Sequence, residues 1–412
     1  MDNEQRRVQL VFFDAGGGHR AATEALKESL AERKPSWRVE VVNLQEVLKS
    51  ADPLYIMTGV PAQDFYNAAL KMGLTYGSRP FLRGLQAVIK LCAPRIENVL
   101  REHWRGENGK IDIVVSLIPN FNGVLFRSLQ AERPHVPFVT IMTDMADTPP
   151  HFWQEKQDQY LVCGTDYAAQ QARATGWYRD ERIFRTSGMI LRPSFYRTEH
   201  APRLRRAELG LAEDKATAIV MFGGYGSNVA EDIVDRLNKA KLGVQCIVMC
   251  GRNESLRAEL QGKENCAAIG YTQDVVSYMR LADFFIGKPG PGSMSEAWRM
   301  GLPVIVERNA RTMIQERPNV TVAAQAGVGL AVPSFRSIAK VVRGLIDGRK
   351  LEDMRINVRK MDNRAVFEIP DILDRIMHEH IADAANIVAF KPRRRLAARI
   401  AQRWKTRRRK SG

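Results

Sequence analysis

The segment FFIGKPGPGSMSEAWRMGLPVIV, residues 284–306, decides the fold. Phe284 to Gly287 is a short apolar run typical of a buried strand, and the Pro-Gly-Pro-Gly sequence after it can continue neither a strand nor a helix. Ser293 is expected to be the N-cap of the next helix, with Glu296 completing a capping box. A helix that begins at a glycine-rich turn presents free N–H groups to phosphate. The segment therefore predicts a β-α-β crossover, either a phosphate-binding one or a plain one with a well-capped helix.

A second turn of this kind lies near the N-terminus, in VQLVFFDAGGGHRAATEALKESLAER, residues 8–33. The apolar run 8–13 is suited to a parallel strand buried on both faces. Three glycines make the turn, and apolar residues then recur at helical spacing at Ala22, Leu26 and Leu30. The turn lacks the Gly-Lys-Ser/Thr ending of a P-loop and the register of a GxGxxG fingerprint.

Strands and helices alternate along most of the 412 residues, which predicts an α/β protein with parallel sheets. A chain of this length is expected to form two domains. The proline- and arginine-rich stretch 187–206 is the expected hinge. We therefore predict two Rossmann-like domains facing a central cleft, residues 1–190 and 191–365, and a C-terminal helix that returns to the first domain and continues into a basic tail, residues 366–412. The expected strands are 8–13, 38–43, 111–117, 137–142, 160–163, 218–222, 244–249, 267–269, 284–286 and 303–306.

The formal net charge of +16 is concentrated in the last 22 residues. Residues 391–412 contain eleven Lys and Arg and no acidic residue, so a charge of +5 remains for the rest of the chain. Leu396, Ile400 and Trp404 are spaced for one face of a helix. A basic helix of this kind is expected on an anionic membrane, where each basic residue contributes about 1 kcal/mol. Nucleic acid would attract the same charges and is the less favoured partner, and a merely solvated tail is the third alternative.

The insertion at 53–91 mixes aromatic, Met and Leu side chains with scattered Lys and Arg. It is interpreted either as ordinary core with loops or as an amphipathic surface that enters a lipid interface. The N-terminus has no signal-peptide pattern, and no run reaches the ~18–20 apolar residues of a membrane span. Five cysteines without CxxC pairs and seven histidines without paired spacing indicate neither a disulfide framework nor a structural zinc site. These features predict a cytoplasmic protein that contacts the inner face of the cell membrane peripherally.

The two glycine-rich segments together resemble one family. GGGHRAATEAL near the N-terminus and KPGPGSMSEAWRMGLPVIV followed by IQERPN resemble the monogalactosyldiacylglycerol synthase and processive diacylglycerol glycosyltransferase family. More distantly, they are similar to the bacterial N-acetylglucosaminyltransferase that forms lipid II. The resemblance covers most of residues 8–330 and implies the two-domain glycosyltransferase fold called GT-B.

The resemblance implies that the second domain binds a UDP-sugar donor. Its first glycine turn would approach the diphosphate, Tyr271 would pack on the uracil, and the helix after Gly292 would cap the pyrophosphate. Glu296 would accept hydrogen bonds from the ribose hydroxyls, with a capping role alone as the alternative. Polar residues further on would read the sugar hydroxyls. The implied donor residues are Gly223, Gly224, Gly226, Ser227, Tyr271, Gly292, Ser293, Glu296, Gln315, Glu316 and Asn319.

The resemblance also implies that the first domain binds the acceptor. The helix-start residue His19 could act as a base or bind phosphate, beside acceptor contacts at Gly17 and Gly18. Asp144 is the preferred general base, because it closes an apolar strand at the end where α/β sites gather. His19 without chemistry and Asp144 as a surface turn residue are the alternatives. The implied acceptor residues His151 and Trp153 depart from the family pattern, since the spacing is longer and two prolines precede the histidine.

We therefore expect an inverting glycosyltransferase that moves a hexose, such as galactose, from a UDP-sugar to a lipid acceptor such as diacylglycerol. Backbone amides and helix ends, rather than a metal, are expected to stabilise the leaving diphosphate, because no acidic DxD triplet is present. One alternative is an isomerase of the UDP-sugar 2-epimerase kind, which acts on the donor alone. Another is a membrane- or nucleic-acid-binding protein that acts through its basic tail and has an inert cleft.

Overall fold

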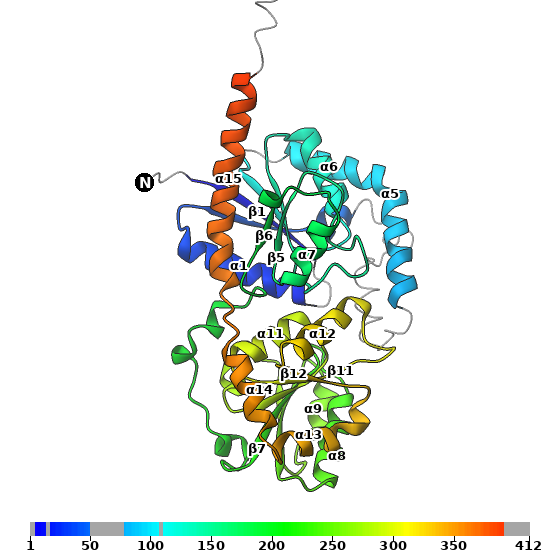
Figure 1. Cartoon of the computed structure of the whole chain (residues 1–412), viewed down its shortest axis with the longest axis vertical. Coiled ribbons are helices and arrows are strands. Elements are labelled where there is room, and N and C mark those ends of the chain that lie inside the picture. Colours follow the sequence, from blue (N-terminus) through cyan, green and yellow to red (C-terminus); the bar gives the residue numbers. More distant parts are fainter. Residues whose placement is uncertain (1–4, 14–16, 50–77, 107–109, 391–412) are drawn as a thin grey trace, which may run out of the picture. The chain divides into compact units, whose positions relative to one another are not determined.

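The computed structural model describes residues 5–13, 17–49, 78–106 and 110–390. The basic tail 391–412 and most of the insertion at 53–91 therefore lie outside the described residues. Contacts divide the chain into two units, Met1–Pro370 and Asp371–Gly412. The first unit contains both sheets shown in Figure 1.

The first sheet has six described strands, all parallel to their neighbours. Their order is β2-β1-β3-β4-β5-β6, so the direction of progression reverses beside β1. Every residue of β3, β4 and β5 is buried, as expected for strands covered on both faces. The strands are β1 (Arg7–Phe12), β2 (Arg38–Asn43), β3 (Ile113–Ser116), β4 (Phe138–Ile141), β5 (Tyr160–Cys163) and β6 (Ile183–Arg185).

Helices cover this first sheet. One cluster packs Leu44, Leu100, Trp104 and Leu125 from three helices against the strands. The first helix packs on β1 and β2 through Leu26 and its neighbours, at the spacing that the sequence predicts. The helices are α1 (Gly18–Arg33), α2 (Leu44–Leu48), α5 (Ser78–Gly106), α6 (Asn122–Glu132) and α7 (Asp166–Ala174).

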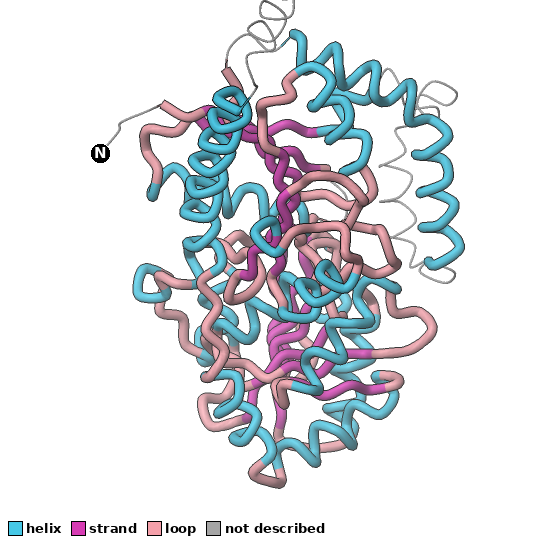
Figure 2. The backbone as a smooth tube through the Cα atoms, turned by 45° about the horizontal axis from the view of Figure 1, so that its top comes forward, coloured by secondary structure: helices cyan, strands magenta, loops and turns pink. Residues whose placement is uncertain are grey.

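The second sheet has the strand order β12-β11-β10-β7-β8-β9, again with all neighbours parallel. This is the order of a Rossmann sheet, with its switch point between β7 and β10. Figure 2 shows the strands of both sheets with helices around them. The strands are β7 (Ala216–Met221), β8 (Val244–Gly251), β9 (Cys266–Gly270), β10 (Phe284–Gly287), β11 (Val304–Glu307) and β12 (Gly329–Val332).

Alternating side chains of the second sheet face two different helix layers. Phe285 packs with α10 (Val275–Met279), α11 (Pro291–Arg299), α12 (Arg317–Gln325) and α14 (Lys350–Arg359). Its neighbour Phe284 packs with α8 (Val229–Lys239), α9 (Glu254–Leu260) and α13 (Ile338–Ile346). Short 3-10 turns complete the chain: η2 (Asp180–Arg182), η3 (Pro193–Phe195), η4 (Thr198–His200), η5 (Arg206–Leu209), η6 (Ile314–Glu316) and η7 (Phe335–Ser337).

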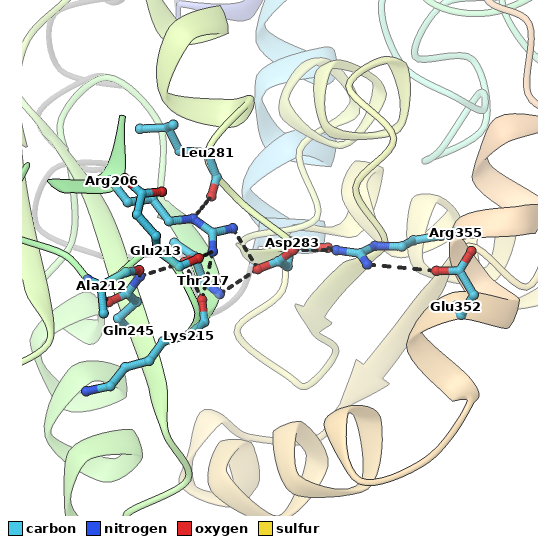
Figure 3. A network of polar contacts seen from close by, with 10 residues as sticks. All are labelled: Arg206, Ala212, Glu213, Lys215, Thr217, Gln245, Leu281, Asp283, Glu352 and Arg355. Carbon is cyan, nitrogen blue, oxygen red and sulfur yellow. Dashed lines mark hydrogen bonds and ion pairs between the residues drawn. The ribbon is translucent and has the colours of Figure 1, made fainter. Parts of the chain in front are cut away.

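A polar network fastens the segment that connects the two sheets (Figure 3). Arg206 of η5 donates to Asp283 Oδ2 at 3.0 Å and to the carbonyl oxygens of Leu281 and Lys215. Arg355 of α14 donates to Asp283 Oδ1 at 2.6 Å. Asp283 directly precedes β10, so the network lies at the amino ends of the strands.

The second unit consists, among the described residues, of the part of α15 (Ala365–Phe390) that follows Pro370. This matches the helix expected over 366–390, whereas the domain boundaries expected at 190 and 365 remain predictions. No helix of the described chain is long and apolar enough to cross a membrane. All five cysteines are free.

The ten expected strands are confirmed, with ends shifted by up to two residues, and two further strands are present. The additional β6 has three residues, and β12 includes partly exposed positions. The three residues of β6 are too few to show a period, and β12 (Gly-Leu-Ala-Val) is an apolar run too short for periodicity to distinguish a strand from a helix segment.

Candidate active site

A cavity of about 1440 Å³ is lined by residues that follow strands of both sheets. Its wall includes the turns after β1, β3 and β4 of the first sheet and those after β7, β8, β9 and β10 of the second. Ligands of open α/β sheets bind at this carboxyl edge, beside the switch point. The cavity is therefore the candidate active site.

Most residues expected at the site line this cavity. Five do not: Gly226, Ser227, Asn319, His151 and Trp153. Those that line it come from both halves of the chain and are Gly17, Gly18, His19, Asp144, Gly223, Gly224, Tyr271, Gly292, Ser293, Glu296, Gln315 and Glu316.

The helix after the Gly-Pro turn begins earlier than the sequence predicts. The expected N-cap at Ser293 and its capping box are wrong: α11 begins at Pro291, with Gly290 as N-cap and no side-chain capping bond. Proline is favoured at the first helical position because its ring fixes φ and it has no N–H to satisfy. Ser293 consequently lies in the first turn, and its side chain and that of Glu296 are not used for capping.

Glu296 faces the cavity from α11. Burial raises its pKa to about 7, and Arg192 opposes the shift. Its carboxylate does not cap α11 and lines the cavity, where it can accept hydrogen bonds from a ligand.

The glycines after β7 have different tasks. Gly223 has φ of 86° and lines the cavity with Gly224. Gly226 has φ of 61°, and a Cβ there would lie 2.5 Å from the carbonyl oxygen of Cys250. Its lack of a side chain serves packing against the end of β8. Ser227 Oγ accepts a hydrogen bond from Val229 N at 3.4 Å, near the start of α8.

The polar residues around η6 form one wall. Gln315 and Glu316 are buried, and Gln315 Oε1 has no partner in the described part of the chain. Asn319 is fully buried behind them and donates to the carbonyl oxygen of Pro289 at 2.8 Å, which holds the turn before α11. Glu316 Oε1 lies 3.0 Å from Nζ of Lys288. This wall offers hydrogen-bond acceptors beside the Gly/Pro turn that precedes α11.

Asp144 follows β4 and is 7% exposed. Its Oδ2 accepts a hydrogen bond from Nε1 of Trp153 at 2.9 Å. Burial raises the pKa of Asp144 to about 7; the Trp153 hydrogen bond and Lys288 oppose the shift, whereas Glu316 adds to it. A carboxylate with a pKa near neutrality is suited to general base catalysis.

His19 lies at the start of α1, with Nδ1 2.8 Å from Oγ1 of Thr143. Burial lowers its pKa to about 4, although a backbone hydrogen bond with Leu117 works in the opposite direction. The imidazole is therefore neutral at physiological pH and is occupied by protein contacts.

The two residues that departed from the family pattern, His151 and Trp153, do not line the cavity. Trp153 is fully buried and contacts Asp144 instead. His151 is exposed, has φ of 64° and stacks on Trp177 with ring centroids 4.9 Å apart. Asp147 holds this loop by accepting hydrogen bonds from the backbone N–H groups of both residues.

An apolar patch lines part of the cavity over the first sheet, beside the charged side chains Arg20, Glu24, Lys27 and Glu28 of α1. Helix α5 presents the partly exposed Val88 there, and the phenyl ring of Phe13 lies 5.0 Å from that of Phe121. The apolar lining of this side is Phe13, Leu48, Val88, Ile89, Cys92, Ile96, Phe121 and Phe152. A hydrophobic ligand fits such a wall.

The polar residues that line the cavity and were not expected at the site include Lys288, Arg192, Arg252 and Thr143. Lys288 lies within the quoted GKPGPGS segment, and its charge beside a glycine turn is the signal that could have revealed it. Arg252 lies 4.8 Å from the ring centroid of Tyr271, a contact between residues that follow different strands. Spacing along the chain gives no sign of this pair.

No group of three or more His, Cys, Asp and Glu side chains that could hold a metal ion occurs in the described ranges. The expectation that no metal is required remains a prediction.

Two parallel sheets with a cavity at their carboxyl edges and glycine turns around it define the architecture of the GT-B fold. Residues 218–376 match the glycosyltransferase family 28 C-terminal domain. The chain is 28% identical over 401 residues to the chloroplastic monogalactosyldiacylglycerol synthase of Spinacia oleracea, covering 91% of this chain and 73% of that protein. The predicted resemblance to that family is confirmed.

Solved structures agree on the fold. MurG of Acinetobacter baumannii has a TM-score of 0.55 and 11% identity, covering 90% of this chain and all of that one. A putative UDP-N-acetylglucosamine 2-epimerase from Listeria monocytogenes has a TM-score of 0.56 and 16% identity, covering 91% of this chain and 95% of that one. At these identities the likeness concerns the fold and does not choose between the transferase and the epimerase reactions.

Proposed function

We propose that this glycosyltransferase transfers a hexose, with inversion, from a UDP-sugar to a lipid acceptor such as diacylglycerol at a membrane surface. The observation that carries the proposal is the division of the cavity lining. One side has glycine turns and buried acceptors, and the other has an apolar patch beside charged residues of α1, with Asp144 among the residues that line the cavity. The similarity to monogalactosyldiacylglycerol synthases supports the same donor and acceptor classes.

On the donor side, the first turn of α11 offers N–H groups to the diphosphate at Gly292 and Ser293. Tyr271 is 54% exposed in the cavity and would stack on the uracil. Glu296 would accept from the ribose hydroxyls, and the unpartnered Gln315 Oε1 from a hydroxyl of the sugar.

On the acceptor side, the apolar wall would hold the acyl chains and leave the hydroxyl near Asp144. The Asp144 carboxylate takes the hydroxyl proton while the acceptor oxygen attacks the anomeric carbon from the face opposite UDP. The bond from that carbon to the diphosphate breaks, and UDP leaves with the electron pair. His19, held by Thr143, positions the turn around Asp144 and does not take the proton.

UDP release tests the proposal. The purified chain is incubated with a panel of UDP-sugars, with and without diacylglycerol in anionic vesicles. We expect release that requires the lipid, prefers one sugar and persists in EDTA, because the chain's own amides and cations would stabilise the leaving group. Isomerisation of the donor without lipid would instead establish the epimerase reaction. Binding of a UDP-sugar without any turnover would favour an inert cleft.

A further inference from the structure

Lys288 is a cation in the cavity that the proposed mechanism has not yet used. It directly follows β10, and its Nζ lies 3.0 Å from Glu316 Oε1. The Lys288 side chain is 41% exposed, whereas that of Glu316 is 9% exposed, so the ammonium is the partner that remains accessible from the cavity. Glu316 raises the pKa of Lys288, which keeps the ammonium charged.

The Lys288 side chain passes between two glycine turns. Its Cε lies 3.7 Å from the place that a Cβ on Gly223 would occupy and 3.6 Å from the corresponding place at Gly290. These turns follow β7 and β10, the adjacent strands at the switch point of the second sheet. A Cβ at either glycine would be in ordinary van der Waals contact with Cε, so the stem of Lys288 lies against both turns.

An ion pair alone explains Lys288 incompletely. Because the lysine side chain is 41% exposed, its pairing with one carboxylate contributes little to stability. An ammonium has three N–H donors, of which the contact with Glu316 occupies one. The remaining donors can serve an anionic ligand that enters the cavity.

We propose that Lys288 binds the β-phosphate of the nucleoside diphosphate and neutralises the charge that develops on it as it leaves. This inference rests on the proposed function. The ammonium keeps its protons throughout, and its N–H groups donate to the diphosphate oxygen that receives the electron pair of the breaking bond. Since Glu316 holds Nζ on the side of the sugar-reading wall, the cation lies at the sugar end of the diphosphate. Lys288 thus supplies a fixed charge where some transferases use a divalent cation.

Binding of UDP and UMP to the Lys288→Met variant, followed by calorimetry, tests the assignment, because UMP lacks the β-phosphate. Because the variant loses a charge-assisted hydrogen bond to the β-phosphate, it should bind UDP roughly 10- to 100-fold more weakly than the unchanged protein does. Its affinity for UMP should be unchanged. Lys263→Met is the matched control: this lysine pairs with Glu231 and Asp235 outside the cavity. It should alter neither affinity.

Unchanged UDP affinity in the Lys288→Met variant would overturn the inference, as would an equal loss for UDP and UMP. Failure of the unchanged protein to bind either nucleotide would instead overturn the proposed function itself.

Two further variants keep the test valid if Lys288→Met folds poorly. Lys288→Arg keeps the charge and should retain UDP affinity within about tenfold, and Glu316→Gln should retain it too. Loss of UDP affinity in Glu316→Gln equal to that in Lys288→Met would show that only the ion pair matters and would overturn the inference.

Discussion

The indole of Trp153 donates a hydrogen bond to the Asp144 carboxylate at 2.9 Å, although the two residues lie nine positions apart in an irregular segment. The bond fixes Oδ2 and directs the remaining oxygen of a nearly buried carboxylate. Trp153 itself does not line the cavity. It therefore acts on the reaction through Asp144, as a positioning residue.

Replacing Asp144 by Asn should abolish the base while leaving the donor site intact. General base catalysis contributes about 10²- to 10⁴-fold, so kcat should fall by that factor and the UDP affinity should not change. In the unchanged protein, kcat should rise with pH up to about 7, because only the ionised form of Asp144 accepts the proton. A pH–rate profile without this acid limb would contradict the assignment of Asp144 as the base.

The same substitution should make the protein more stable at alkaline pH. A carboxyl whose pKa is raised from 3.8 to about 7 on folding binds a proton more tightly in the folded state, so it lowers the free energy of unfolding as pH rises through that range. Asp144→Asn removes this penalty, on the order of 1–4 kcal/mol. Urea unfolding at pH 8 and at pH 4 measures it. The gain should be present at pH 8 and absent at pH 4, and an equal gain at both would contradict the pKa shift.

Trp153→Phe should move the acid limb of the pH–rate profile upward by about one pH unit, because the Trp153 hydrogen bond lowers the pKa of Asp144. Trp298→Phe is the control. Its Nε1 is buried without a partner among the described residues, so its loss removes no hydrogen bond. A profile unchanged in Trp153→Phe, or shifted equally in Trp298→Phe, would show that the indole does not tune the carboxyl.

Much of this site could be predicted from the sequence, because in a parallel sheet the site residues directly follow the buried strands along the chain. Buried strands are continuous apolar runs. Twelve of the seventeen expected site residues line the cavity, and they lie in the turns that follow such strands or in α1, α11 and η6. What the sequence could not reveal depends on contacts between distant turns. The distance from Lys288 to Glu316 and the bond from Trp153 to Asp144 exist only once the strands are ordered.

The prediction that α11 begins after Ser293 was wrong for a different reason. Ser293 and Glu296 match a capping box as well as they match a ligand site, and Pro291 decided between the two helix starts. The strands β6 and β12 were missed because runs of three and four residues are too short for periodicity to distinguish a strand from other structure.

His19 should contribute to activity without acting as the base. Because its pKa is lowered to about 4 and Thr143 occupies Nδ1, the imidazole stays neutral over the whole range of the assay. His19→Gln should therefore lower kcat by less than about tenfold, below the range that a general base supplies. The acid limb near pH 7 should stay in place. If the acid limb disappeared in His19→Gln and persisted in Asp144→Asn, His19 would be the base and Asp144 would not.

Asp283 should be important for stability and not for catalysis. It accepts from both Arg206 and Arg355 at the amino ends of the strands, whereas the cavity lies at their carboxyl ends. Asp283→Asn leaves the partly buried guanidinium of Arg206 without a countercharge and that of Arg355 with Glu352 alone, which should lower the free energy of unfolding by about 2–3 kcal/mol, less than for a fully buried pair because the carboxylate is 23% exposed. Asp235→Asn, at a carboxylate 56% exposed and paired with Lys263, should cost less than about 1 kcal/mol. Urea unfolding compares the two variants, and calorimetry should give unchanged UDP affinity for both. A weaker UDP affinity in Asp283→Asn would mean that the connecting segment also shapes the donor site.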